Sequence, residues 1–224
     1  MRNIVWSWPS LAGGLVATLV DARAAAGHFD VDDATVLDPG HCQYETWLAR
    51  APGLSTTLFH LGPSCRVGPV EAGLNYDRLR SADERRDGFG PQLKWVVDPL
   101  VDRFSVGAAW NASFNLVHGG RPWQSLYVPV TWWAAEKLWI HVNAGADWSP
   151  AGERTRRLGV SGEWAVNDSL SVIAERVTFY GDWTSRIGTR FNLDESISID
   201  VSAARTGPQR AHLFAIGLNR DFKP

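Results

Sequence analysis

The sequence lacks the features by which most soluble enzymes and helical membrane proteins are recognised. After residue 26 no apolar run approaches the ~18 residues that a transmembrane helix needs. The GxSxG, HExxH, CxxC and phosphate-loop motifs do not occur. The formal net charge is only −2, which gives no reason to expect a nucleic-acid partner. Common hydrolases, nucleotide-binding proteins and helical membrane proteins are therefore not indicated, and neither a cofactor nor a metal is expected.

Methionine and cysteine are also scarce, with one and two residues, whereas tryptophan occurs twelve times in 224 residues. Tryptophan prefers positions with one wet and one apolar side, such as a membrane interface. Two cysteines can form a disulfide if the chain reaches an oxidising compartment. The N-terminus therefore decides how the cysteines are interpreted.

Residues 1–26 have the layout of a secretory signal peptide. Arg2 supplies the charged start, residues 4–20 are mostly apolar, and Ala22-Arg23-Ala24 or Ala24-Ala25-Ala26 offers a small-residue cleavage site. A transmembrane anchor is the alternative, but proline, glycine and aspartate interrupt the apolar run. The mature chain is therefore expected to be exported, and any membrane span in it must consist of strands.

The stretch 27–40 is polar and acidic, with aspartates at 30, 32, 33 and 38. Their spacing matches no calcium-binding loop. Two placements remain open: a solvated periplasmic lead-in, or a segment that enters the mouth of a barrel. The composition favours the solvated lead-in.

From residue 41 onward, apolar and polar residues alternate with the period of two that indicates β-strands. Phe104 and Val106, for example, alternate with Ser105 and Gly107. About twelve such segments fit into residues 41–224, and bacterial single-chain barrels have an even number of strands. The predicted fold is therefore all-β: a transmembrane antiparallel up-and-down β-barrel of about twelve strands.

The alternation is weakest over residues 169–180, where both faces are apolar and Arg176 falls on the wrong one. A β-bulge in this segment would restore the alternation.

Alternation alone does not say which face points outward, because a soluble lipocalin-like binding barrel has the same period with its apolar side inside. The polar face here consists mainly of Gly, Ser, Asn, Asp and Arg, not of the long Lys and Glu typical of a solvent-exposed face. Small residues suit a confined, hydrated interior. The composition therefore favours a membrane barrel whose polar face lines the lumen.

Charged residues of both signs occur on this polar face. The candidate lumen-lining residues are Glu45, His60, Arg66, Glu71, Asp77, Lys94, His141, Asp147, Arg157, Glu163, Arg186, Arg190 and Asp200. Folding the hairpins predicts cross-strand pairs: Arg66–Glu71, His60–Asp77, Asp147–Arg157, His141–Glu163 and Arg190–Asp200. Such pairs either only neutralise and brace the interior, or also narrow a pore and set its ion selectivity.

The two cysteines lie on the apolar face of neighbouring predicted strands. A hairpin centred between Gly53 and Leu54 places Cys42 directly opposite Cys65 as a non-hydrogen-bonded pair. A structural disulfide is expected; the alternative is two buried free thiols.

The last strand has a pattern that matters for assembly. Residues 211–222 carry Phe214, Ile216, Leu218 and Phe222 on one face, with Gly217 on the other. These residues resemble the C-terminal assembly signal of outer-membrane barrels, so the barrel-assembly machinery is an expected partner.

Two motifs also resemble a known family. The stretch from Val31 to Gly40, followed by Gln43-Tyr44-Glu45, and the closing Gly217-Leu218-Asn219-x-x-Phe222 are similar to proteins of the phenol-degradation meta-pathway outer-membrane family. Arg220 departs from the pattern, since an aromatic residue is usual there. The resemblance implies a channel for small aromatic or apolar compounds and carries over no binding residues.

Together these patterns predict a narrow passive channel for a small-molecule solute, in contact with the lipids of the bacterial outer membrane. An outer-membrane lipid hydrolase is one alternative, with His141 as the only suggestive residue. A structural or adhesive barrel without transport is another.

Overall fold

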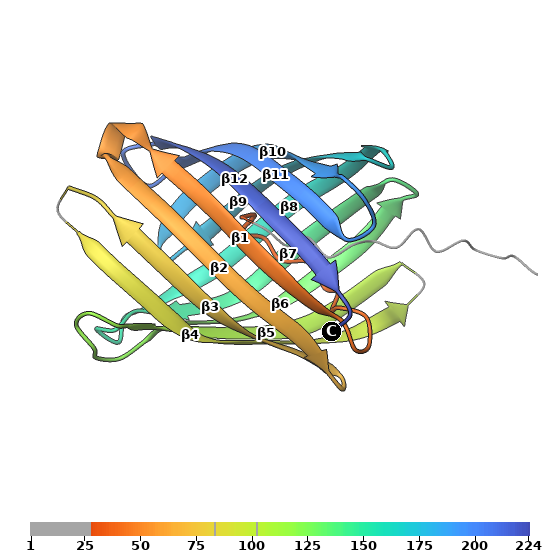
Figure 1. Cartoon of the computed structure of the whole chain (residues 1–224), viewed down its shortest axis with the longest axis horizontal. Coiled ribbons are helices and arrows are strands. Elements are labelled where there is room, and N and C mark those ends of the chain that lie inside the picture. Colours follow the sequence, from red (N-terminus) through yellow and green to blue (C-terminus); the bar gives the residue numbers. More distant parts are fainter. Residues whose placement is uncertain (1–27, 83, 102) are drawn as a thin grey trace, which may run out of the picture.

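A computed structural model describes residues 28–82, 84–101 and 103–224. The predicted signal peptide, residues 1–26, lies outside these described residues. Twelve strands form a closed antiparallel barrel, which confirms the fold predicted from the alternation. Figure 1 shows the strands running obliquely around the barrel. Within the described ranges no helix is long and apolar enough to cross a bilayer.

The strands follow one another around the wall in chain order. They are β1 (Cys42–Ala51), β2 (Thr56–Val67), β3 (Val70–Arg80), β4 (Arg85–Val101), β5 (Phe104–Asn115), β6 (Trp123–Ala135), β7 (Leu138–Trp148), β8 (Arg154–Asn167), β9 (Leu170–Phe179), β10 (Asp182–Asn192), β11 (Ile197–Thr206) and β12 (Ala211–Phe222), with one turn of 3₁₀ helix, η1 (Pro52–Leu54). The first and last strands pair from Cys42↔Phe222 to Arg50↔Phe214. This pairing closes the barrel and leaves no strand edge.

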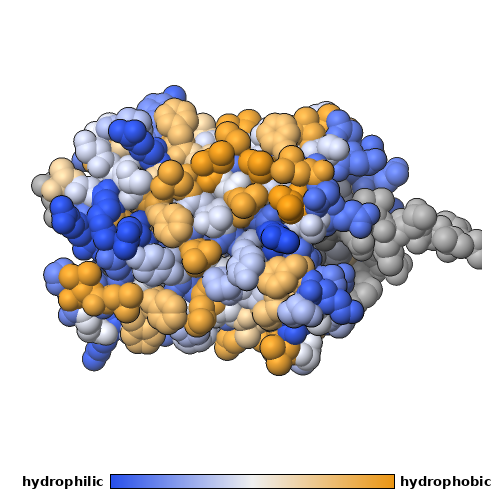
Figure 2. Space-filling model, viewed as in Figure 1, coloured by the Kyte–Doolittle hydropathy of each residue, from blue (hydrophilic) through white to orange (hydrophobic). Residues whose placement is uncertain are grey.

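The apolar face of the strands points outward. On β12, Phe214 and Ile216 are each 54% exposed, whereas Ala215 between them is buried. On β7, Val142 is exposed and the flanking His141 and Asn143 are buried. An apolar belt therefore surrounds the barrel, and Figure 2 shows orange residues gathered over the middle of the visible face, with bluer residues towards both ends. This is the arrangement of a membrane barrel and not of a soluble lipocalin-like one.

The two ends of the barrel differ in their connections. β2–β3, β6–β7 and β8–β9 are joined by pairs of residues, such as Gly68-Pro69, at the end where β1 begins and β12 finishes. Longer connections, such as 116–122 and 149–153, lie at the opposite end. We call these the inner and the outer end, since short turns face the periplasm in such barrels.

The bulge expected within residues 169–180 is not where the pattern placed it. β9 pairs with β10 in regular register, and the only irregularity against β8 lies between Ala165 and Asn167. Arg176 stays on the outward face, where its guanidinium lies 4.7 Å from the centre of the Trp183 ring. A cation–π contact thus accommodates this charge, and no bulge is required.

Cys42 and Cys65 form a disulfide, as predicted. They are direct partners in the β1–β2 register. The Arg66 amide donates to the His41 carbonyl one position away at 2.9 Å, so the cysteines occupy a non-hydrogen-bonded pair. The bridge joins the first hairpin next to the seam between β1 and β12.

Replacing both cysteines by alanine should destabilise the barrel without changing its fold. The bridge closes a loop with a sequence separation of 23, and its removal restores unfolded-state entropy equivalent to about 3 kcal/mol. Urea unfolding of the oxidised wild type and the double variant measures the difference. The reduced wild type is the control and should match the variant; labelling of two thiols by a maleimide before reduction would contradict the bridge.

Candidate functional site

Residues 28–40, which we call the luminal segment, enter the barrel: residues 28–37 are buried or half-buried within it, and Asp38, Pro39 and Gly40 are exposed. Val31 is 1% exposed and Ala34 is fully buried, and Phe29 and Leu37 are also buried. The solvated lead-in favoured by the composition is therefore wrong, and the alternative placement inside the barrel is the one observed. The acidic composition misleads because the wall supplies the partners that water would otherwise supply.

The backbone of the luminal segment is bound by side chains of the wall. The amides of Asp30 and Val31 donate to the Glu175 carboxylate on β9 at 2.9–3.1 Å. Asn143 on β7 accepts from the Asp32 amide at 2.8 Å and donates to the Asp32 carbonyl at 2.7 Å. Further along, the Ala34 amide donates to the Thr131 hydroxyl at 2.8 Å. Buried backbone groups need partners, and here side chains take the place of a strand ladder.

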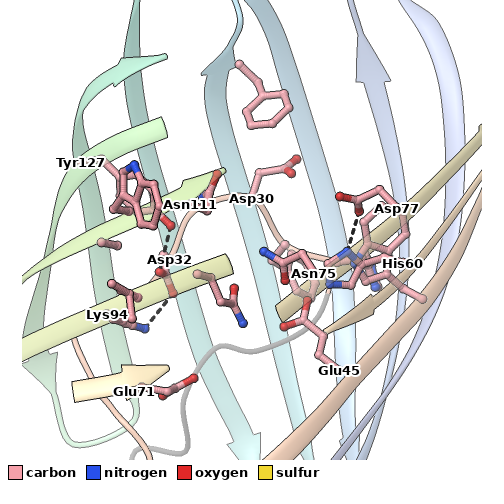
Figure 3. Close-up of a pocket in the computed structure, with 18 of the residues that line it drawn as sticks. Asp30, Asp32, Glu45, His60, Glu71, Asn75, Asp77, Lys94, Asn111 and Tyr127 are labelled. Atoms are coloured by element: carbon pink, nitrogen blue, oxygen red, sulfur yellow. Dashed lines mark hydrogen bonds and ion pairs between the residues drawn. The ribbon is translucent and has the colours of Figure 1, made fainter. Parts of the chain in front are cut away.

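The aspartates of the luminal segment meet cations on the wall. Lys94 on β4 places its Nζ 2.8 Å from both Asp32 Oδ1 and Asp33 Oδ1. Tyr127 on β6 donates its hydroxyl to Asp32 at 3.1 Å, as Figure 3 shows. Across the lumen, Arg186 lies 3.0 Å from Asp30. Several strands are therefore linked through one short stretch of chain.

Glycines of the wall make room for the apolar side chains of the luminal segment. A Cβ at Gly159 would lie 2.9 Å from Val31 Cγ2, and one at Gly188 would lie 3.0 Å from Phe29 Cζ. Both distances are shorter than an ordinary contact between carbon atoms. Inward-facing glycines thus shape the lumen to this segment.

His28, at the start of the described chain, is buried, and this burial together with the positive charge of Arg186 lowers its pKa to about 4. His28 is therefore neutral at neutral pH and adds no charge to the lumen.

Three of the five predicted cross-strand pairs form. His60 Nδ1 lies 2.7 Å from Asp77, Arg190 Nε lies 2.8 Å from Asp200, and Arg157 Nη1 lies 3.5 Å from Asp147. These pairs come from direct or diagonal neighbours in adjacent hairpin strands.

The other two predicted pairs are replaced by different contacts. Arg66 donates to the carbonyls of Leu37 and Gly68. Its predicted partner Glu71 instead accepts hydrogen bonds from the Gln43 side chain, the Ser64 hydroxyl and the Leu37 amide. His141 lies 2.9 Å from the Thr131 hydroxyl, and Glu163 is two positions away in the register. Three of these six contacts are made with the luminal segment or with the Thr131 hydroxyl that holds it.

Cavities lie on both sides of the luminal segment. One of about 240 Å³, drawn in Figure 3, is lined by Asp30 and Asp32 of the segment together with Glu45, His60, Glu71, Asp77, Lys94 and Arg157 of the wall. Two more, of about 640 and 450 Å³, lie towards the inner end. Asp33, His141, Glu163 and Arg190 line the larger of these two. Nine of the thirteen candidate lumen residues thus line one of these cavities, and the other four, Arg66, Asp147, Arg186 and Asp200, line none of them.

The sequence did not indicate the wall residues that hold the luminal segment. Asn143, Thr131, Tyr127 and Glu175 are polar residues on an inward face, like many others on that face. One signal was present: the inward positions of β9 include Ile173 and Val177, which are buried at 2% and 0% exposure. Apolar residues facing a hydrated lumen indicate that something covers them.

The fold and its charged lumen define a twelve-stranded barrel of the outer-membrane type. The chain belongs to the family described as uncharacterised conserved protein UCP029691, whose model matches residues 14–219. No curated protein matches the sequence.

Solved structures share the architecture at low sequence identity. The KdgM porin is 11% identical with a TM-score of 0.65, covering 81% of this chain and 99% of that one. The COG4313 outer membrane channel from Pseudomonas putida F1 is 11% identical with a TM-score of 0.60, covering 87% and 100%. The NanC porin is 11% identical with a TM-score of 0.58, covering 80% and 98%. These matches establish the fold, and the resemblance to the phenol-degradation family is not confirmed by name.

Replacing Lys94 by methionine should loosen the luminal segment. The change removes the cation that lies between Asp32 and Asp33. The two carboxylates, which are mostly buried, then lack their counter-charge, and such a loss is strongly destabilising in proteins. Hydrogen exchange of the amides of residues 30–37 should accelerate by at least about tenfold, as expected when such a local contact is lost. Lys137→Met, in the inner turn between β6 and β7, is the matched control. Equal exchange in the two variants would contradict the role of Lys94.

Proposed function

We propose that this protein is a narrow passive channel of the bacterial outer membrane, constricted by its own luminal segment. The observation that carries the proposal is the polar, charged lumen, with cavities on both sides of residues 28–40. A barrel that served only as a membrane anchor would need neither buried charges nor interior space. The outward apolar belt supports the membrane location.

The comparisons support the same proposal at the level of architecture. The structures with TM-scores of 0.58–0.65 are described as porins or as an outer membrane channel. A related KdgM structure is described as a complex with disordered oligogalacturonate, a ligand of that protein alone. A similar barrel can therefore serve as a pore.

The lining of the lumen favours small polar solutes over the apolar compounds that the family resemblance implies. Carboxylates, amides, the Lys94 ammonium and the Arg157 guanidinium line the cavity drawn in Figure 3. Trp47, stacked on His60 with ring centres 5.1 Å apart, offers one flat surface for a planar group. A solute must be small, because the cavity beside the luminal segment measures about 240 Å³.

The hydrolase alternative receives no support from His141. Its imidazole contacts the Thr131 hydroxyl, which accepts the Ala34 amide of the luminal segment. This arrangement holds the segment in place. Only a measurement of ionic current distinguishes a channel from a structural barrel without transport.

Deleting residues 28–37 tests the proposed function. The deletion leaves the turn from Asp38 to His41 that leads into β1. In planar bilayers the wild type should pass a small current, and the deletion should raise the single-channel conductance severalfold because the constriction is gone. If neither protein conducts, the barrel is structural and the channel proposal fails.

The arginines of the lumen predict a change in ion selectivity. Arg186 and Arg190 face Asp30, Glu175 and Asp200, so replacing both arginines by alanine leaves carboxylates in excess. The reversal potential in a KCl gradient should shift towards cation selectivity. Arg220→Ala, on the outward face, is the matched control. An unchanged reversal potential in the double variant would mean that the ion pairs only brace the wall.

A further inference from the structure

Arginines gather on the outward face near the outer end of the barrel. Arg50, Arg78, Arg80 and Arg85 lie there on β1, β3 and β4, each paired in register with outward-facing neighbours. Four more, Arg154, Arg156, Arg176 and Arg205, lie on the outward face of β8, β9 and β11. Among the described strand residues that face outward near the outer end, Asp87 is the only carboxylate. Figure 2 shows a blue cluster at the end opposite the C-terminus, next to the orange residues of the middle.

This charge pattern constrains what surrounds the barrel. An arginine that faces hydrocarbon is costly, and the cost falls towards zero only at the level of the headgroups. The arginines at this end are therefore expected at headgroup level. Eight cations against one carboxylate leave the outward strand face at this end positively charged, and anionic headgroups offer the counter-charge.

A groove on the same wall joins this charge to an apolar surface. It measures about 370 Å³ and is lined by Leu48, Thr57, Phe59 and Tyr76, with Arg78 and Arg80 on the side of the outer end. Leu48 is 48% exposed, so its surface is available to a ligand.

Asp87 holds the two arginines in fixed positions. It lies 2.9 Å from Arg78 Nε and 2.8 Å from Arg80 Nη2, and the Tyr76 hydroxyl donates to it at 3.1 Å. Arg78 and Arg80 nevertheless remain 51% and 36% exposed. One carboxylate neutralises only one of the two guanidinium groups, so this oriented pair keeps a positive charge directed outward.

We propose that this groove binds a phosphorylated lipid of the outer leaflet, with the phosphate on Arg78 and Arg80 and an acyl chain along Leu48, Phe59 and Tyr76. The planar guanidinium group matches phosphate oxygens through paired hydrogen bonds. The apolar part of the groove requires a chain that inorganic phosphate lacks. The proposal rests on the outer-membrane location and is independent of whether the barrel conducts.

The test uses the full mature chain, folded in a nanodisc of phosphatidylcholine. Native mass spectrometry measures the binding of lipid A that carries two phosphates, of the same lipid A after dephosphorylation, and of inorganic phosphate. Wild-type protein should bind the phosphorylated lipid at least about tenfold more tightly than the dephosphorylated form, as expected for the loss of charge-assisted hydrogen bonds.

Variants assign the binding to the groove. Arg78→Gln with Arg80→Gln should weaken binding by about tenfold, and Asp87→Asn should strengthen it because both guanidinium groups become available. Arg220→Gln, an outward-facing arginine at the inner end, should leave binding unchanged. Heat-modifiable migration on a gel verifies the fold of each variant; if the double variant does not fold, Asp87→Asn and the dephosphorylated lipid decide.

The proposal is overturned if the double variant binds as tightly as wild type, or if dephosphorylation has no effect. It is also overturned if inorganic phosphate competes as well as the lipid, since the groove would then be an anion site only. The double variant should conduct as the wild type does. The lipid-binding test measures no current, so it remains decisive even if the channel proposal fails.

Discussion

Every backbone N–H and C=O that crosses lipid must find a partner within the protein, because hydrocarbon offers none. The pairing of β1 with β12 satisfies this constraint by removing the last free edge. The Cys42–Cys65 bridge sits at the start of β1, where the seam begins, and ties that strand to β2. Paired strands are extended, so successive side chains point alternately to the lipid and to the lumen. This alternation determines which residues reach the lumen.

Inside the barrel, the groups that need partners are charged side chains, because the lumen contains many of them and is only partly filled with water. The structure offsets the cost of burying them by pairing charges across strands and with the luminal segment. Arg190 and Asp200 are 4% and 0% exposed and form a direct ion pair. Lys94 contacts two aspartates of the segment. Removing one partner of such a pair costs more than the pair contributes, so the segment and the wall depend on each other.

The sequence predicts the wall far better than what the wall encloses. Strand count, the direction of the faces and the register that joins Cys42 to Cys65 all follow from local alternation and hairpin parity. Three of the predicted ion pairs also follow, because their members are neighbours in adjacent strands. The position of the luminal segment does not follow from the sequence, because its partners are distant in the chain: the amides of Asp32 and Val31 bond side chains 111 and 144 residues away. No local pattern encodes such contacts, and aspartates in an unpaired stretch are typical of solvated chain.

The contacts of the luminal segment also have a mechanical consequence. Through residues 30–33 it ties Lys94 on β4 to Asn143 on β7, Glu175 on β9 and Arg186 on β10, which lie on different parts of the circumference. A hollow cylinder under lateral pressure from the bilayer can flatten by bending its wall, without breaking any hydrogen bond along its strands. A cross-link through the interior opposes that deformation directly, because flattening must stretch or compress it. The cross-sectional shape of this barrel is therefore set from within as well as by the number of its strands.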